Sequence, residues 1–166
     1  MATTKLGENT INTAGDLPEV GSQAPEFTLV AGDFSEVSLD DLAGRRIVLN
    51  IFPTVDTPVC SASVRHFNQL ASSLDNTTVV CVSADLPISA SRFCAAEGLE
   101  NVTTASTFRS PAFGQAYGTT MADGAWAGLQ ARAVVVIGDD GKVLYTELVP
   151  AIGQEPDYDA AVASLS

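Results

Sequence analysis

The stretch RIVLNIFPTVDTPVCSASVRHFNQLASSL, residues 46–74, leads from a strand through a proline-containing corner into a helix. Residues 46–52 are mostly apolar and rich in β-branched side chains, which predicts a buried central strand. From Cys60 onward, apolar side chains recur at the spacing of one helical face, at Cys60, Val64, Phe67 and Ala71. The pattern therefore predicts a strand followed by a helix, with Cys60 at the helix start and facing inward.

Similar strand and helix signals alternate along the rest of the chain. We expect strands at 25–30, 77–86 and 101–106, a short strand and brief helix within 35–44, helices at 88–98, near 111–118 and at 155–165, and a hairpin with an Asp-Gly turn within 131–149. Residues 1 to about 20 could form a small N-terminal β-hairpin. This order predicts an α/β protein with a mixed central sheet flanked by helices, and a thioredoxin-like fold fits it.

Length and composition limit the possible classes of protein. The 166 residues suffice for one compact domain spanning 1–166, and 46% hydrophobic against 17% charged residues is a globular composition. The net charge of −12 disfavours nucleic acid and anionic membranes as partners, because like charges repel. The first residues lack the pattern of a secretory signal, and no stretch approaches the length of a membrane span. A cytoplasmic location is expected.

Cys60 is a candidate nucleophile because of where the pattern puts it. A thiol at a helix N-terminus meets unpaired backbone N–H groups and the positive end of the helix dipole, and both favour the thiolate. Pro53 and Pro58 can hold a stiff corner before it, and Thr57 could orient a bound oxygen. A small buried apolar residue is the commoner role of an arbitrary cysteine.

The spacing Pro53, three residues, Thr57, two residues, Cys60 resembles the signature of peroxiredoxins. The similarity is greatest to the bacterial thiol peroxidases and runs in one colinear order from about residue 18 to the C-terminus. The blocks that carry it are LNIFPTVDTPVCSASVRHFNQLA, SADLPISASRFCAAEGLENV, STFR, FGQAYG, ADG, GLQARAVVVI and EPDYDAAVASL.

The resemblance implies a role for each matching residue. Cys60 would be the peroxidatic cysteine, Thr57 and Pro53 would shape its pocket, Arg132 would be its cationic partner and Cys94 the resolving cysteine. A guanidinium beside the sulfur would stabilise both the thiolate and the charge on the leaving oxygen. Without the resemblance, Arg132 would pass for a surface arginine and Cys94 for a packing residue beside Phe93.

The resemblance also implies substrates and partners. It implies reduction of hydrogen peroxide and organic hydroperoxides, recycling of a Cys60–Cys94 disulfide by thioredoxin, and a homodimer, with no metal, flavin or haem. Phe52, Met121 and Trp126 could line a pocket for an alkyl chain, although each fits a core or a dimer contact equally well.

Other thiol functions fit the sequence less well. A thioredoxin-type dithiol would need a cysteine where Ser63 stands, and Cys81 lies mid-strand, where burial suppresses reactivity. His66, the one histidine, lies about 240° around the helix from Cys60 at ~100° per residue, so it is a poor base for a cysteine hydrolase. The cysteines are too widely spaced for a structural zinc site. A redox-responsive interaction protein remains the non-enzyme alternative, and it would react once and stall.

Overall fold

The computed structural model describes residues 2–166, whose elements follow the predicted order. The strands are β1 (Thr3–Leu6), β2 (Asn9–Asn12), β3 (Thr28–Ala31), β4 (Glu36–Ser38), β5 (Arg46–Ile51), β6 (Thr77–Ser83), β7 (Thr103–Ser106), β8 (Ala133–Ile137) and β9 (Val143–Leu148). The helices are the 3-10 helix η1 (Asp40–Leu42) and α1 (Pro58–Ala71), α2 (Pro87–Glu97), α3 (Pro111–Ala116) and α4 (Tyr158–Ala163). The predicted mixed α/β, thioredoxin-like arrangement is confirmed.

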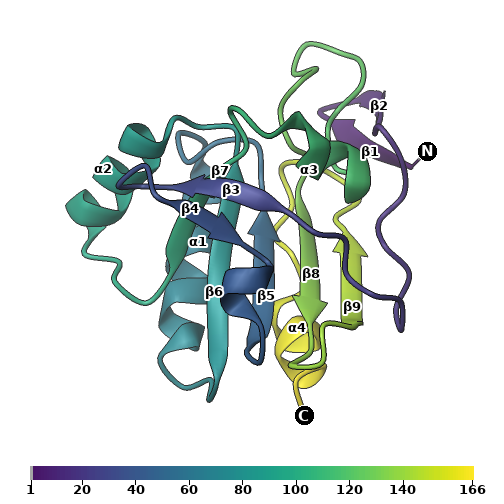
Figure 1. The fold of residues 1–166 in the computed structure, drawn as a ribbon. Coiled ribbons are helices and arrows are strands. Elements are labelled where there is room, and N and C mark those ends of the chain that lie inside the picture. Colours follow the sequence, from purple (N-terminus) through teal and green to yellow (C-terminus); the bar gives the residue numbers. More distant parts are fainter. Residues whose placement is uncertain (1) are drawn as a thin grey trace.

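Strand β5 lies inside a mixed sheet. Within the described residues this sheet has seven strands in the order β4-β3-β7-β6-β5-β8-β9. β5 pairs in parallel with β6 and antiparallel with β8, and every residue from Ile47 to Ile51 is buried. Figure 1 shows β6, β5 and β8 side by side, with α2 to one side of the molecule and the β1–β2 hairpin on the other. The apolar run of residues 46–52 is thus explained by cover on both faces of the sheet.

Alternate residues of the central strands enter two separate apolar clusters. Val48 and Val134 pack with Cys60, Phe67 and Ala161, on the face of the sheet covered by α1 and α4. Neighbouring residues along the same strands pack on the opposite face, with α3 and the segment that leads into β3: Ile47, Leu49, Ile51, Val80, Val135, Phe27, Phe113 and Tyr117. The period of two is the one that an extended strand imposes on its side chains.

Proline marks the start of three helices. Pro58, Pro87 and Pro111 each occupy the first helical position, where a missing N–H costs nothing and a fixed φ favours the helix. α1 accordingly begins at Pro58, two residues before the position that the sequence pattern gave for it, and Cys60 is its third residue. Gly98 ends α2 in the left-handed conformation, with φ 68°, as its position predicted.

The predicted N-terminal hairpin is present as the antiparallel pair β1–β2. Ile11 of β2 packs over Met121, Ala131 and Ile152 in a third apolar cluster. The strand predicted at 25–30 is shorter at its start and begins at Thr28. Among residues 2–166, no helix combines the length and apolar character that crossing a membrane requires.

Candidate active site

Cys60 lies in the first turn of α1, directly after the corner that follows β5. Its side chain is 0% exposed and packs with Phe52, Val55 and Val64. Thr57 holds the N-cap position, yet within the described part of the chain no side chain caps this end of α1. Cys60 therefore belongs to the first turn of a helix whose start has no side-chain cap, and the unpaired N–H groups of such a helix start favour negative charge nearby.

Arg132 contacts this sulfur from the neighbouring strand. β8 pairs with β5 so that Ala133 lies opposite Ile51, and Arg132, one residue before β8, is brought beside the chain that leaves β5. Its Nη2 donates to the Cys60 Sγ at 3.0 Å, and its Nε donates to the carbonyl oxygen of Ile152 at 2.8 Å. The guanidinium is thus held in place at two of its nitrogens.

The cation is fully enclosed. Arg132 is 1% exposed, and its Nη1 is a buried nitrogen with no hydrogen-bond partner within residues 2–166. Because little water screens a buried pair, the positive charge of this guanidinium stabilises the thiolate form of the sulfur that it contacts. Its unpaired N–H group is also a free donor for an oxygen brought to the sulfur.

The predicted pocket residues Pro53 and Thr57 belong to the corner between β5 and α1. Pro53 is buried, and Thr57 is partly exposed. The Thr57 hydroxyl donates to the carbonyl oxygen of Thr54 at 3.2 Å, and its own carbonyl accepts from the Ser61 N–H at 3.0 Å. The structure therefore holds Thr57 in a turn of the corner itself, three residues before the sulfur.

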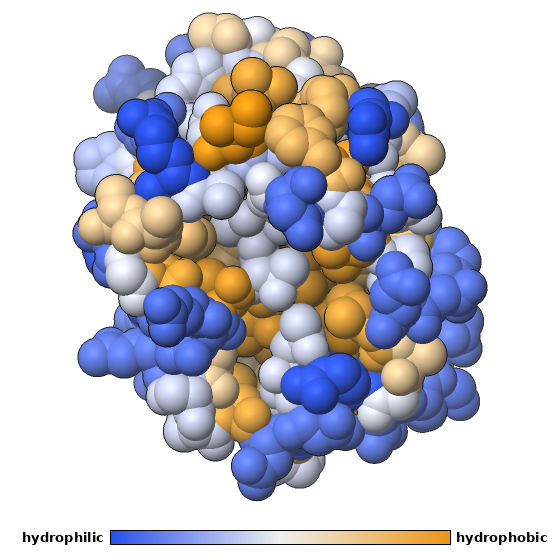
Figure 2. All heavy atoms as spheres, turned by 60° about the vertical axis from the view of Figure 1, so that its left-hand side comes forward, coloured by the Kyte–Doolittle hydropathy of each residue, from blue (hydrophilic) through white to orange (hydrophobic). Residues whose placement is uncertain are grey.

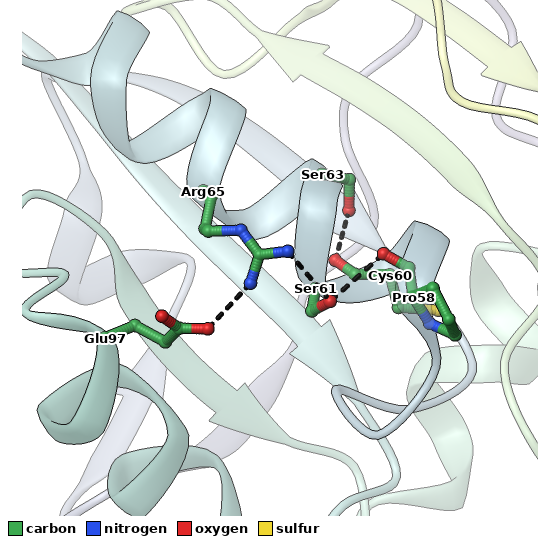
Figure 3. A network of polar contacts seen from close by, with 6 residues as sticks. All are labelled: Pro58, Cys60, Ser61, Ser63, Arg65 and Glu97. Atoms are coloured by element: carbon green, nitrogen blue, oxygen red, sulfur yellow. Dashed lines mark hydrogen bonds and ion pairs between the residues drawn. The ribbon is translucent and has the colours of Figure 1, made fainter.

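A chain of polar contacts links the first turns of α1 to the end of α2 (Figure 3). The Ser61 hydroxyl donates to the Pro58 carbonyl at 3.0 Å, and Arg65 Nη2 donates to Ser61 Oγ at 3.3 Å. Arg65 Nη1 then pairs with Glu97 of α2 at 2.7 Å. Both partners are largely exposed (45% and 39%), so the pair contributes about 0–1 kcal/mol at most.

Cys94 lies on α2 at the edge of the cluster that contains Cys60. It is half-buried, it packs against that cluster from outside, and burial raises the pKa of its thiol. It also lines a groove of about 450 Å³ that is bounded by the β3–β4 turn and by β7. All three cysteines are free thiols.

Cys81 lies in the middle of β6 and is buried, as the apolar run predicted. Burial raises the pKa of this thiol to about 12, against a smaller lowering by the hydrogen bond from Asn50. That bond joins Asn50 Nδ2 to Cys81 Sγ at 3.7 Å. Cys81 is therefore a neutral packing residue at physiological pH.

The only histidine is exposed, as expected, and its ring is occupied elsewhere. His66 stacks on Tyr158 of α4, with the ring centres 3.7 Å apart. Tyr158 packs in the cluster of Cys60, and its hydroxyl donates to Glu155 at 2.8 Å. Burial, followed by this bond, raises the pKa of the Tyr158 phenol above its usual range. No pattern in the sequence indicates this role of Tyr158, because its neighbours come from distant parts of the chain.

The three apolar residues suggested for an alkyl pocket do not lie together. Phe52 packs beside Cys60, whereas Met121 and Trp126 belong to the cluster beneath the β1–β2 hairpin, with Ile11. The reason is that residues 121–128 form a loop whose backbone bonds to β2: the N–H of Ala122 donates to the carbonyl of Asn12 at 2.8 Å.

Asp85 is the residue of this region that the sequence reading missed. It follows β6, and its carboxylate accepts hydrogen bonds from Thr54 and Val55 in the corner before α1. The available signal was its position after a buried strand, because neighbouring parallel strands such as β5 and β6 end at the same edge of a sheet.

A thiol at a helix start, bonded to a buried guanidinium on a thioredoxin-like sheet, is the arrangement of a thiol-dependent redox enzyme. Comparisons with known proteins narrow this class. A family model described as "Redoxin" matches residues 19–162. The thiol peroxidase of Mycobacterium tuberculosis H37Rv is 58% identical over 165 residues, 99% of each chain, and that of Corynebacterium glutamicum is 53% identical over the full length of both. A solved peroxiredoxin-like protein from Aquifex aeolicus matches with a TM-score of 0.92 and 37% identity, covering 98% of this chain and 95% of that one.

The chain therefore belongs to the redoxin family, as a peroxiredoxin of the thiol peroxidase branch. Its function is that of a thiol peroxidase, which uses a thiol to reduce a peroxide.

Proposed function

We propose that Cys60 is the peroxidatic residue of this enzyme, reducing hydrogen peroxide and organic hydroperoxides, and that Arg132 is its cationic partner. The observation that supports this most directly is the 3.0 Å hydrogen bond from Arg132 Nη2 to Cys60 Sγ in a site closed to water. Sulfur is nucleophilic as the thiolate, and a buried cation at this distance favours that form.

The proposed step consumes one thiolate and one hydroperoxide. The Cys60 sulfur attacks one peroxide oxygen, so that an S–O bond forms while the O–O bond breaks and the second oxygen leaves with the electron pair. That oxygen takes up a proton and departs as an alcohol or as water, and the sulfur remains as sulfenic acid. Nη1 of Arg132, which no described residue engages, is available to bind the oxygen on which charge develops.

Substrate has to reach a sulfur that lies just below the surface. Cys60 itself is 0% exposed, but Thr57 and Val59 are partly exposed and Pro58 is exposed. We propose entry at this corner, with Pro53 and Thr57 shaping the pocket. A small displacement of residues 57–59, which are at least partly exposed, would open the path without disturbing the buried Arg132.

Cys94 is the proposed resolving cysteine. Its thiol attacks the Cys60 sulfenic acid, which releases water and forms the Cys60–Cys94 disulfide. A disulfide needs Cα atoms within about 7 Å, and we propose that part of α2 unwinds to bring the two thiols together. α2 is suited to this because it buries only Pro87 and Ala90, whereas α1 buries five residues.

The proposed partners extend this cycle. Thioredoxin would reduce the disulfide in a reducing cytoplasm, and two copies of the chain would form a homodimer. Large apolar side chains are exposed at Leu86, Ile88 and Phe108, and Figure 2 shows apolar surface in several places between polar side chains on the face turned to the viewer.

An apolar substrate pocket predicts a higher kcat/KM for cumene hydroperoxide than for hydrogen peroxide, and equal values would contradict that preference.

Peroxide consumption with thioredoxin recycling tests the proposal. We expect no turnover with Cys60→Ser, at most one turnover with Cys94→Ser, and nearly wild-type turnover with the control Cys81→Ser. Full activity of Cys60→Ser would overturn the assignment. A wild-type protein that reacts once and stalls, even with reductant present, would point to the redox-responsive interaction protein.

A further inference from the structure

The carboxylate of Asp85 makes three contacts at the base of the active-site corner. Oδ1 accepts from the Thr54 hydroxyl at 2.6 Å. Oδ2 accepts from the Val55 backbone N–H at 2.9 Å and from the Ser83 hydroxyl at 2.7 Å. Two of these three donors belong to the corner between β5 and α1, which carries Pro53 and Thr57 and leads to Cys60.

Asp85 is itself fixed to the ends of two central strands. Its N–H donates to Ser83 Oγ at 3.3 Å, and its carbonyl oxygen accepts from the Ser106 hydroxyl. Ser83 and Ser106 are buried and lie opposite each other in the β6–β7 pairing. Hydrogen bonds to Ser83 and Ser106 therefore fix the backbone of Asp85 at the edge of the sheet, and its carboxylate faces the corner from there.

The chemistry of the contacts matches an ionised carboxylate. Such a group only accepts hydrogen bonds, and all three partners are donors. Hydrogen bonds to a charged acceptor are roughly twice as strong as those between neutral groups. Thr54 is bound from both sides, because its hydroxyl oxygen also accepts from the Asp56 N–H at 3.2 Å. The corner is thus tied to the sheet at two consecutive residues.

We propose that Asp85 is a positioning residue of the peroxidase reaction: by binding Thr54 and Val55 it holds the corner in the shape in which Pro53 and Thr57 enclose the peroxide beside Cys60. This inference rests on the proposed function. Within residues 2–166, the hydrogen bonds of Asp85 do not include the sulfur, and Arg132 is held by Cys60 and by the carbonyl oxygen of Ile152 instead. Loss of Asp85 should therefore impair the reaction with peroxide more than the general reactivity of the thiol.

The test is Asp85→Asn, which keeps the shape but leaves one oxygen. With its NH₂ toward Val55, the amide would set one N–H donor against another, and the backbone N–H cannot turn away. With its NH₂ toward Thr54, the hydroxyl would have to turn from donor to acceptor, and the Val55 N–H would keep only a neutral acceptor. In either orientation both corner residues lose their bond to a charged oxygen. We expect the single-turnover rate constant of Cys60 with hydrogen peroxide to fall by about tenfold or more, as a slightly misplaced substrate pocket produces. We expect the rate of Cys60 alkylation by iodoacetamide at pH 8 to change less than about twofold, because alkylation needs access to the thiolate but not the alignment of a peroxide by Pro53 and Thr57.

Asp123→Asn is the matched control. Asp123 also accepts from a backbone N–H and a side-chain amide, both of Asn12, at 3.0 and 2.7 Å, but it lies at the β1–β2 hairpin. It should retain the wild-type rate with peroxide. A wild-type rate in Asp85→Asn, an equal loss in Asp123→Asn, or a parallel loss of alkylation and peroxide reaction would each overturn the proposal.

Thr54→Val provides a second variant if Asp85→Asn fails to fold. It removes one of the two corner contacts while keeping the side-chain shape, and a severalfold loss of the peroxide rate is expected. An unchanged rate would count against Asp85. A wild-type protein that does not react with peroxide at Cys60 would contradict the proposed function instead, so the two failures are distinguishable.

Discussion

Replacing Arg132 by Met tests the cationic partner of Cys60 at a known distance. Methionine is also unbranched and fills a buried site of similar length, but it has neither charge nor N–H donor. The contact that is lost joins Nη2 to the Cys60 Sγ at 3.0 Å, in a site where Arg132 is 1% exposed. The carbonyl of Ile152 loses its donor Nε at the same time.

The size of the effect follows from the geometry. Two unit charges 3.0 Å apart attract by about 5.5 kcal/mol at an effective dielectric constant of ~20, and desolvation cancels a large part of this. A hydrogen bond to a charged group is worth about 1.5–3 kcal/mol net. Since about 1.4 kcal/mol is a tenfold change in rate, the rate constant with peroxide should fall about 10- to 150-fold.

The assay is single-turnover oxidation of the reduced protein by hydrogen peroxide, with Arg132→Lys as the comparison. Lysine keeps the charge but cannot bind the sulfur and the Ile152 carbonyl with one rigid fork, so its rate should lie between wild type and Arg132→Met. A rate for Arg132→Met within twofold of wild type would show that the buried cation has no part in the chemistry.

Two further predictions concern the inert thiol and the backbone. Because burial raises the pKa of Cys81 to about 12, only about one molecule in 10⁴ carries this thiolate at pH 8, and raising the pH toward 12 increases that fraction. Iodoacetamide at pH 8 should therefore leave Cys81 unlabelled in the folded protein. Rapid labelling of Cys81, measured by peptide mass spectrometry, would contradict its burial. Gly118→Ala places a Cβ at φ 69° and 2.3 Å from the Asp16 carbonyl oxygen, whereas Gly98→Ala has a similar φ and open space. Both variants should lose stability in thermal unfolding, and Gly118→Ala should lose more than ~1 kcal/mol because its Cβ also meets the Asp16 backbone. Equal losses in the two variants would show that the contact with Asp16 is unimportant.

The features that local patterns specify were predictable from the sequence. The strand at 46–52, the inward-facing Cys60 and the closing Gly98 follow from residue periodicity and backbone preference, which act over a few neighbours. The blocks shared with thiol peroxidases then directed attention to Arg132, which by itself has no pattern. The structure brings Arg132 to Cys60 through the β5–β8 register, a pairing of strands more than 80 residues apart in sequence.

The features that depend on long-range packing were not predictable. Asp85 binds Thr54 across 31 residues of sequence, and its position after a buried strand places it at the edge of the sheet without indicating which residues it binds. Met121 and Trp126 were plausible neighbours of Phe52 as apolar residues, but the β1–β2 hairpin gives them a different place to pack. Apolar character predicts burial, whereas the identity of the neighbours depends on topology.

Chemical trapping of the oxidised sulfur shows which cysteine reacts with peroxide. Reduced Cys94→Ser protein is treated with one equivalent of hydrogen peroxide in the presence of dimedone, which captures sulfenic acids, and the adduct is located by peptide mass spectrometry. We expect a single adduct, on Cys60, if this thiol is the one that attacks peroxide. An adduct on Cys81, or none while peroxide is still consumed, would contradict this role of Cys60.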